Sequence, residues 1–404
     1  MGIFFIYVSL ILLFSLILKI KIYHPVVITH IIWFIVISLY NIIPSKLYPL
    51  SHNVYTRLSL YLFFFLMGTL FYYLVFGLKK KNCFNQNMTD SNTNILFYFV
   101  FSLTVYLLLR YFMMFAKGTT LYKEIVQGRL TNDLKVLFYF DKLSLVYFFY
   151  LITVKEKLSK KEKIFVTLFF ITYFLKFSKM DVMQLFTAIL LTLWIKKKIK
   201  IHHIILSALL MFFLLAFIHL WRVGNTTSIA KAIGEMMAIY FLSPITAFDM
   251  IVNNQISFNK YQTFVFLERF FSKIFQINIF NSNSQSFDGW VFVPYPTNVY
   301  TCMWRFYSDF REIGLIVFGH FIGFFWTFIY DRRYKAVFNL IYTSLFYILI
   351  FQFFSDILFG YFSAVLQTIL VCLVVVKLKQ SEITRHEVSL LFSYKFNYYI
   401  EESK

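Results

Sequence analysis

Charged residues are scarce in this sequence. Asp, Glu, Lys and Arg make up 14% of its 404 residues, against roughly 25% in an average protein. Hydrophobic residues make up 60% of the chain, and the mean hydropathy is +0.69. A water-soluble fold of this length has no interior large enough to hide so much apolar surface, so the composition excludes a soluble protein and indicates a polytopic membrane protein.

Cysteine and glycine are also sparse, and their absence excludes several kinds of site. Cys83, Cys302 and Cys372 share no spacing, so neither a disulfide framework nor a zinc site is indicated, and we expect no metal and no cofactor. The sequence holds no glycine-rich phosphate loop, internal repeat or coiled coil. No soluble domain stands out either, since the cytoplasmic tail 378–404 has fewer than thirty residues. A cytoplasmic domain for a nucleotide sugar or ATP has no place to fold.

The net charge of +20 does not point to nucleic acid, because the basic residues form no single patch. They fall in short clusters between apolar runs, as topology signals do. A spanning helix needs about 20 mostly apolar residues. By this measure the chain 1–404 is one all-α transmembrane domain with about eleven spans: 2–18, 25–43, 58–78, 95–115, 137–154, 164–178, 180–195, 203–220, 312–330, 336–354 and 357–376.

The first span lacks a basic flank and a cleavage site, so we expect it to be retained. With these spans, every Lys/Arg cluster falls on one side, which the positive-inside rule makes the cytoplasm. The clusters are 19–21, 79–81, 155–163, 196–200, 331–335 and the tail from Lys377. This alternation predicts a multi-pass membrane protein with its N-terminus outside. It also predicts three outer segments: 44–57, 116–136 and 221–311.

The outer loop 221–311 is too long for a connector. Apolar positions recur at helical spacing from Ser228 to Asn253, with a break near Pro244, and 257–280 is a second amphipathic stretch. We expect both to lie on or dip into the outer face of the bilayer.

Two outer arginines are candidate phosphate ligands. Arg222 follows the apolar run "FIHLW" and precedes the turn "VGN", and Arg129 lies in the polar "EIVQGRLTND". Forked hydrogen bonds from two such arginines suit a diphosphate. The alternatives are a snorkelling interfacial Arg222 and a solvated Arg129.

Outer carboxylates are few: Glu124, Asp133, Asp181, Glu235, Asp249, Glu268, Asp288, Asp309, Glu312 and Asp356. A sugar transfer needs a group that accepts a proton from the attacking hydroxyl. By context the candidates are Asp309 and Glu235, with His219 a weaker choice. For Asp309, a helix cap is the competing interpretation.

The segment "PYPTNVYTCMWRFYSDF", residues 294–310, combines aromatic, amide and hydroxyl groups at high density. Such groups together bind sugar rings, although an aromatic belt at the membrane surface is an alternative. The candidate substrate-binding residues are Arg305, Tyr295, Asn298, Tyr300, Thr301 and Tyr307.

This segment and its surroundings resemble the O-antigen polymerase family, the oligosaccharide repeat-unit polymerases of bacterial surface polysaccharide synthesis. The family has a "P-T-N-x-Y-T" type element, matched by 296–301, followed by "Y-x-D-F-G-x-x-G" before a span. Here the second element is 307–314, with Arg311 at the first glycine and Gly314 at the second. The family's small-residue-plus-arginine motif corresponds to "FSKM", 177–180, which has Lys179 as its cation.

The resemblance implies a GT-C-like membrane glycosyltransferase acting at the outer face. It would transfer a growing glycan from undecaprenyl diphosphate onto a new undecaprenyl-diphosphate-linked repeat unit, as in O-antigen or capsule synthesis, without a nucleotide sugar. Arg222 and Arg129, helped by Arg305, would stabilise the leaving diphosphate, and Asp309 or Glu235 would be the base. The family also implies a partner protein that regulates chain length.

Two other functions stay open. An O-antigen ligase, which joins a finished glycan to a lipid core, also uses outer arginines, and the sequence separates it from a polymerase only through the motif residues in 296–310. A flippase or transporter needs charged residues within several spans, and here Arg110, Asp141 and Lys142 are the main ones.

Overall fold

The computed structural model describes residues 1–43, 46–77, 95–119, 132–155, 157–176, 178–223, 234, 237–256, 262–275 and 289–381. Within these ranges, the side chains of 132–135, 179, 215, 218–223, 269–270 and 273–274 are outside the description. The chain forms two compact units. Unit 1 comprises 1–80, 205–332 and 345–366, and unit 2 comprises 81–204, 333–344 and 367–404.

Unit 1 is built mainly from helices. They are α1 Gly2–Ile17, α2 Pro25–Ile42, α3 His52–Phe76, α9 Ile201–Val223, η1 Met237–Leu242, α11 Ser243–Val252, η2 Gln262–Phe264, α12 Val265–Phe275, α13 Trp304–Asp331 and α15 Ile357–Gly360. Its one described sheet pairs β1 Val291–Phe292 with β2 Pro296–Thr297.

Unit 2 contains α4 Ile95–Ala116, α6 Asn132–Val154, α7 Lys160–Leu175 and α8 Lys179–Ile195. The boundary between the units falls within α14 Ala336–Ile350 and again within the last described helix, Phe362–Ser381.

The predicted all-α membrane class is confirmed. Each predicted span coincides with a described helix, and six of these helices are long and apolar enough to cross a membrane. Five further apolar helices are shorter. The count of eleven spans and the GT-C-like arrangement stay predictions.

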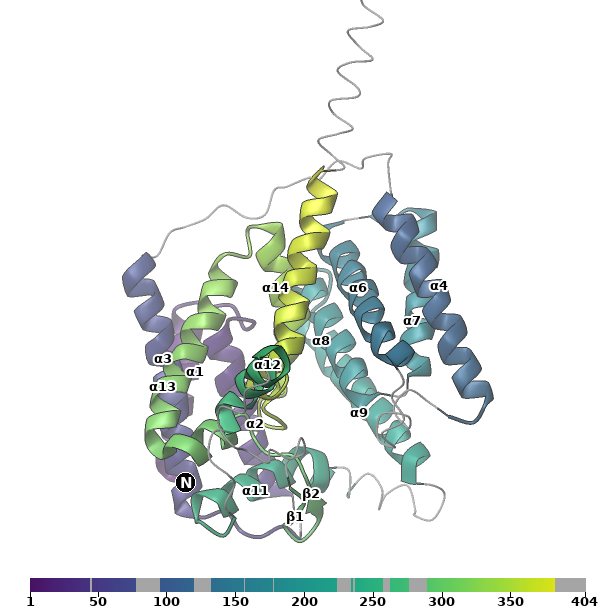
Figure 1. Cartoon of the computed structure of the whole chain (residues 1–404). Helices are drawn as coiled ribbons and strands as arrows, with labels where there is room; N and C mark the ends of the chain where they lie inside the picture. The colour runs from purple at the N-terminus through teal and green to yellow at the C-terminus, as the bar shows by residue number, and fades with distance from the viewer. Residues whose placement is uncertain are drawn as a thin grey trace, which may run out of the picture. The chain divides into compact units, whose positions relative to one another are not determined.

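In unit 1, α3 and α13 run side by side (Figure 1), and glycines allow their close approach. A Cβ on Gly68 would lie 2.0 Å from the His320 carbonyl oxygen, and one on Gly323 would lie 2.0 Å from that of Phe65. The hydroxyls of Thr69 and Thr327 hydrogen-bond across the same contact at 2.9 Å. Small residues at a crossing are typical of membrane helix pairs, since they let two backbones touch.

Unit 2 packs α4, α6 and α7 together (Figure 1). The rings of Phe148 and Phe169 stack with centroids 4.6 Å apart, and the Thr104 hydroxyl donates to the Ser144 hydroxyl at 3.1 Å. Aromatic stacking and hydroxyl bonds between helices replace the hydrophobic driving force that is weak in lipid.

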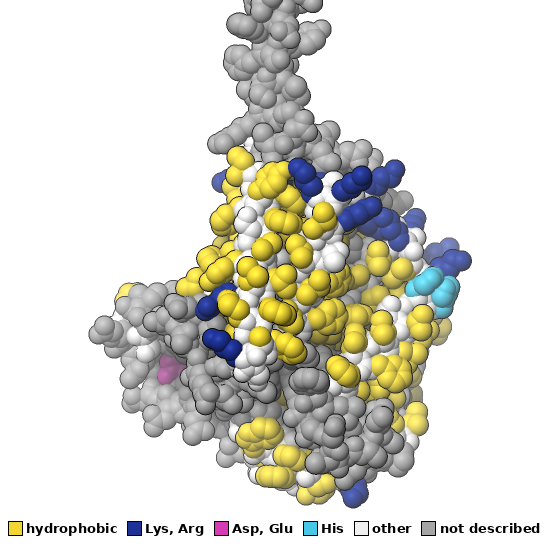
Figure 2. Space-filling model, turned by 90° about the vertical axis from the view of Figure 1, so that its right-hand side faces the viewer, with side chains coloured by type: hydrophobic (Ala, Val, Ile, Leu, Met, Phe, Trp, Pro, Cys, Tyr) yellow, Lys and Arg dark blue, Asp and Glu magenta, His cyan; other side chains and the backbone are white. Residues whose placement is uncertain are grey.

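Within each unit, the basic clusters gather at one end of the helices. In unit 2, Lys155 pairs with Glu162 at 2.6 Å, Lys196 Nζ donates to the Lys155 carbonyl at 2.5 Å, and Lys161 Nζ donates to the Tyr98 hydroxyl at 2.7 Å. On the face drawn in Figure 2, many Lys and Arg side chains gather near one end, and hydrophobic side chains cover much of the remaining described surface. This grouping agrees with the predicted alternation.

In unit 1, the helix ends next to the basic clusters are in contact with one another. The Tyr72 hydroxyl near the end of α3 donates to Asp331 at the end of α13 at 2.8 Å, and His24 hydrogen-bonds Tyr73 at 3.1 Å. The basic residues of 19–21 and Arg332 therefore adjoin one end of unit 1. Which compartment that end faces stays a prediction.

Candidate functional site

The candidate site lies at the opposite end of unit 1 from its basic clusters. We call this region the polar end of unit 1: residues 46–57, 237–256, 262–264, 289–312 and 351–360. In it the segment 289–303 forms a small hairpin. Val291 pairs with Thr297 and Phe292 with Pro296, and the prolines 294 and 296 shape the turn between them.

The aromatic residues after the hairpin are buried. Tyr300 is 1% exposed, donates its hydroxyl to the Gly289 carbonyl at 2.7 Å, and packs on Trp304 with centroids 5.2 Å apart. Tyr307 is 2% exposed and meets Phe248 edge to face. Thr301 is fully buried, and its hydroxyl has no hydrogen-bond partner among the described residues. Of the six predicted substrate-binding residues, Tyr295, Asn298 and Arg305 are partly exposed and the other three are buried.

The sequence predicts a loop up to residue 311, whereas residues 304–310 are helical and form the first part of α13. Arg305, in the first turn of α13, pairs with Asp356, with its Nε 3.1 Å from Oδ2. Its guanidinium also donates to the Gln262 carbonyl at 3.3 Å. Its side chain is 13% exposed and that of Asp356 is 1% exposed. Arg305 is therefore held by protein groups.

Asp356 of this pair lines a small cavity of about 20 Å³, together with Tyr61, Cys302 and Gln352. This volume suits about one water molecule. The Cys302 N–H donates to the Gln352 carbonyl at 2.8 Å. The 294–310 segment is thus joined to the break between α14 and the last helix, where residues 351–360 leave the regular span.

Asp309 accepts two backbone N–H groups. Its Oδ1 lies 3.0 Å from the Gln262 nitrogen and its Oδ2 lies 2.7 Å from the Thr263 nitrogen. These are the first residues of η2, so the carboxylate caps this short helix and the α12 that follows. A carboxylate at a helix N-terminus satisfies donors that have no partner within the helix.

Immediately after Asp309, α13 is sharply kinked. Arg311 has φ 52° and ψ −134°, outside the helical region. A Cβ on Gly314 would lie 2.0 Å from the Phe306 carbonyl oxygen, so only glycine fits the inside of the bend. Glu312 begins the next stretch of helix and is bound by Arg57 of α3, with Nη2 2.7 Å and Nε 3.1 Å from Oε1.

A further carboxylate joins the segments 44–57 and 221–311, both predicted to lie outside. Asp249 on α11 accepts from the Ser51 N–H at 2.9 Å and from the Ser51 hydroxyl, where α3 begins. Every carboxylate described in this polar end therefore has a partner within unit 1, and their contacts join segments that are up to 255 residues apart in the chain.

Unit 2 contains a buried ionic cluster that the sequence did not reveal. Lys176, at the end of α7, is 1% exposed and binds both Asp141 and Asp181, the latter at 3.2 Å. The Asp141 Oδ1 and the Tyr111 hydroxyl are buried with no hydrogen-bond partner among the described residues. Asp141 is one of the charged residues that the sequence analysis found within the predicted spans. Lys176 is part of the basic-looking "LKFSK", and nothing in that pattern signals a partner 35 residues away.

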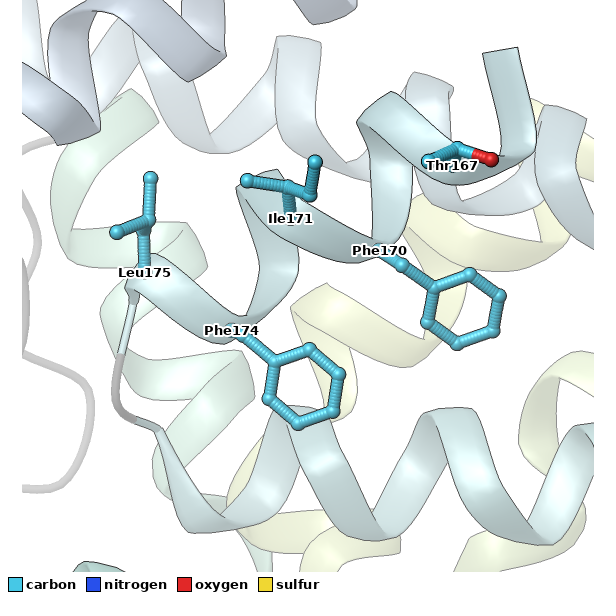
Figure 3. A pocket seen from close by; sticks show the side chains of 5 residues that line it. All are labelled: Thr167, Phe170, Ile171, Phe174 and Leu175. Carbon is cyan, nitrogen blue, oxygen red and sulfur yellow. The ribbon is translucent and has the colours of Figure 1, made fainter. Parts of the chain in front are cut away.

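An open hollow of about 440 Å³ runs along α7, lined by Thr167, Phe170, Ile171, Phe174 and Leu175 (Figure 3). Its one hydroxyl, on Thr167, already donates to the Lys163 carbonyl at 3.1 Å. The lining residues therefore offer no free polar group that could orient a sugar.

Several predicted site residues lie outside the description. Arg129 and Glu235 fall outside the described residues, as do the side chains of Arg222 and His219 on α9 and of Lys179 on α8. Within the part of the chain that is described, no group of three or more His, Cys, Asp or Glu side chains lies close enough to hold a metal ion.

Comparison with protein-family models, with curated proteins and with solved structures finds no match for the chain.

Proposed function

We propose that the chain is a membrane glycosyltransferase that polymerises lipid-diphosphate-linked oligosaccharide repeat units. The observation that carries the proposal is the ordered polar end of unit 1. A membrane protein needs only a short connector between spans, whereas here polar contacts join the 289–310 segment to η2, to the 351–360 break and to Tyr61 of α3. Asp249 of α11 also binds Ser51 at the start of α3. Such pre-organisation is typical of a binding site.

In this proposal the reaction takes place at the outer face of the bacterial cytoplasmic membrane. The donor is a glycan on undecaprenyl diphosphate, and the acceptor is a new repeat unit on the same carrier. No nucleotide sugar is required, which fits a chain with no predicted soluble nucleotide-binding domain.

The contacts refine the roles of the candidate residues. Arg222 and Arg129 remain the proposed diphosphate ligands, whereas Arg305 acts as a positioning residue because Asp356 and Gln262 hold it. Tyr295 and Asn298 keep accessible surface for a sugar. Tyr300, Thr301 and Tyr307 are buried, and their packing stabilises the segment.

The base is then Glu235 rather than Asp309, since both Asp309 oxygens already accept N–H groups. Departure of the diphosphate would be assisted by arginine charge, which stabilises the developing negative oxygen.

Transport or flipping of a lipid-linked glycan is a second candidate, favoured by the Lys176–Asp141–Asp181 cluster of unit 2. Charged groups buried in a membrane protein often mark a substrate or ion path.

Deletion of the gene separates these functions. Loss of a polymerase leaves surface lipid that carries a single repeat unit. Loss of a ligase leaves finished glycan on its carrier, and loss of a flippase leaves single units on the cytoplasmic side. Surface lipid with a single unit is the result we expect, and long surface chains in the deleted strain would refute the proposal.

A further inference from the structure

We infer that Arg311 is a phosphate-binding residue at the polar end of unit 1. The inference deepens the proposed function by naming a cation of unit 1 that meets the lipid diphosphate, and it rests on that function only for the identity of the ligand. It rests on the backbone conformation of Arg311, on its exposure and on the absence of an ion pair or hydrogen bond from its guanidinium to a described carboxylate.

The position of Arg311 differs from that of the other described non-glycine residues with positive φ. The non-glycine residues Lys19, Lys197 and Asn254 have φ of 53°, 55° and 58° and directly follow the ends of helices. At each of these, two backbone hydrogen bonds close the helix end, for example Lys197 N–H to Trp194 at 2.9 Å and Lys198 N–H to Leu193 at 2.9 Å. A left-handed residue is ordinary in such a cap.

Arg311 is not in a cap of this kind. It lies within α13 with φ 52° and ψ −134°, a region that glycine enters freely and residues with a Cβ enter at a cost in stability. Strained residues of this kind persist where the surrounding structure holds them, and they concentrate at functional sites. The close contact of Gly314 with the Phe306 carbonyl fixes the bend. The bend therefore imposes the strained backbone on residue 311, but it does not require an arginine at that position.

The side chain differs from the neighbouring arginines as well. At the polar end of unit 1, Arg57 is bound to Glu312 and Arg305 to Asp356. Arg311 is exposed and forms no hydrogen bond or ion pair with a carboxylate among the described residues, and its guanidinium lies 5.5 Å from the centre of the Tyr307 ring. Its charge acts on the neighbouring Glu312, whose carboxylate is bound by Arg57. Since Arg57 occupies Glu312 and backbone N–H groups occupy Asp309, the two nearest acidic residues in sequence are already engaged.

An exposed guanidinium held over a ring, with its five donors unused by carboxylates, suits a phosphate group. A lipid diphosphate and an ordinary phospholipid headgroup share this chemistry. We assign the site to the diphosphate because Arg311 belongs to the polar end of unit 1, where the proposed function requires a lipid diphosphate to bind.

The test uses the full chain in phosphatidylcholine nanodiscs, with inorganic pyrophosphate as the probe and thermal unfolding as the readout. Arg311→Gly removes both the charge and the strain, so without ligand its Tm should rise by about 2 °C. Pyrophosphate should raise the Tm of the wild type, and Arg311→Gly should weaken its apparent binding at least tenfold.

The matched control is Lys197→Gly, which also removes an exposed cation from a residue with positive φ but leaves the polar end unchanged. It should keep the full pyrophosphate response. Arg311→Lys keeps the charge and the strain but not the fork, so its Tm without ligand should not rise and its binding should be intermediate.

An unchanged pyrophosphate response in Arg311→Gly, no response in the wild type, or a lower Tm of Arg311→Gly without ligand would each overturn the inference. If the substitution Arg311→Gly changes the Tm only in phosphatidylglycerol nanodiscs, and does so without pyrophosphate, the assignment to a diphosphate would be overturned. If the pyrophosphate response depends on Arg311 but cells without the gene make normal chains, the phosphate site stands and the proposed polymerase function fails.

Discussion

Both oxygens of Asp309 accept backbone N–H groups, and this geometry determines how the residue should respond to substitution. In Asp309→Asn, one oxygen becomes an NH2 group that faces a donor, so we expect a loss of about 1–2 kcal/mol in stability. Chain elongation should persist, because the proton acceptor in our account is Glu235. Thermal unfolding and glycan length on gels measure the two effects.

Glu235→Gln is the comparison for that experiment. It should abolish elongation while the protein remains in the membrane. Loss of elongation in Asp309→Asn at unchanged stability would show that Asp309 is the base after all.

The Arg305–Asp356 pair has a second residue-scale consequence. Removing either partner alone leaves a buried charge without compensation, which costs about 3–5 kcal/mol. The double variant Arg305→Met with Asp356→Leu should lose less stability than the sum of Arg305→Met and Asp356→Leu. Unfolding of the four proteins in detergent gives this coupling, and additive losses would mean that the two side chains act independently.

At the scale of elements, the α3–α13 contact depends on glycine. A Cβ at Gly323 would lie 2.0 Å from the Phe65 carbonyl oxygen, so Gly323→Ala must push the helices apart at a cost of about 1–3 kcal/mol. Gly2→Ala meets no atom within 4 Å and serves as the control. Equal melting temperatures of Gly323→Ala and Gly2→Ala would contradict the packing described for α3 and α13.

Hydropathy located the helices well, because a spanning helix is set by the length of its apolar run. The boundaries moved where polar contacts intervene. The helix of the ninth predicted span begins at Trp304, since Arg305 and Asp309 have partners that let a polar turn stay helical. The kink was not predictable, because Arg311 stands where a glycine would have signalled a bend.

The ionic contacts of the site could not be predicted from the sequence either. Arg57 and Glu312 are 255 residues apart, and no periodic pattern joins residues on different helices. The sequence identified the 294–310 segment as polar and dense in aromatics. The structure shows that Tyr295 and Asn298 are partly exposed whereas Tyr300 is buried. This difference depends on packing rather than on residue type, so the sequence could not predict it.

At the scale of the whole molecule, the basic clusters at one end of each unit and the ordered polar end of unit 1 are what an enzyme working at one membrane face requires. The central claim is that this chain alone lengthens a glycan held on a lipid diphosphate.

The most direct test is elongation by the purified protein in nanodiscs, supplied with lipid-linked repeat units isolated from a strain that lacks the gene. We predict a ladder of lipid-linked chains longer than one unit, formed without any added nucleotide sugar and lost in Arg222→Ala and Arg129→Ala. Folded wild-type protein that leaves every unit single, or that extends chains only when a nucleotide sugar is added, would contradict the account.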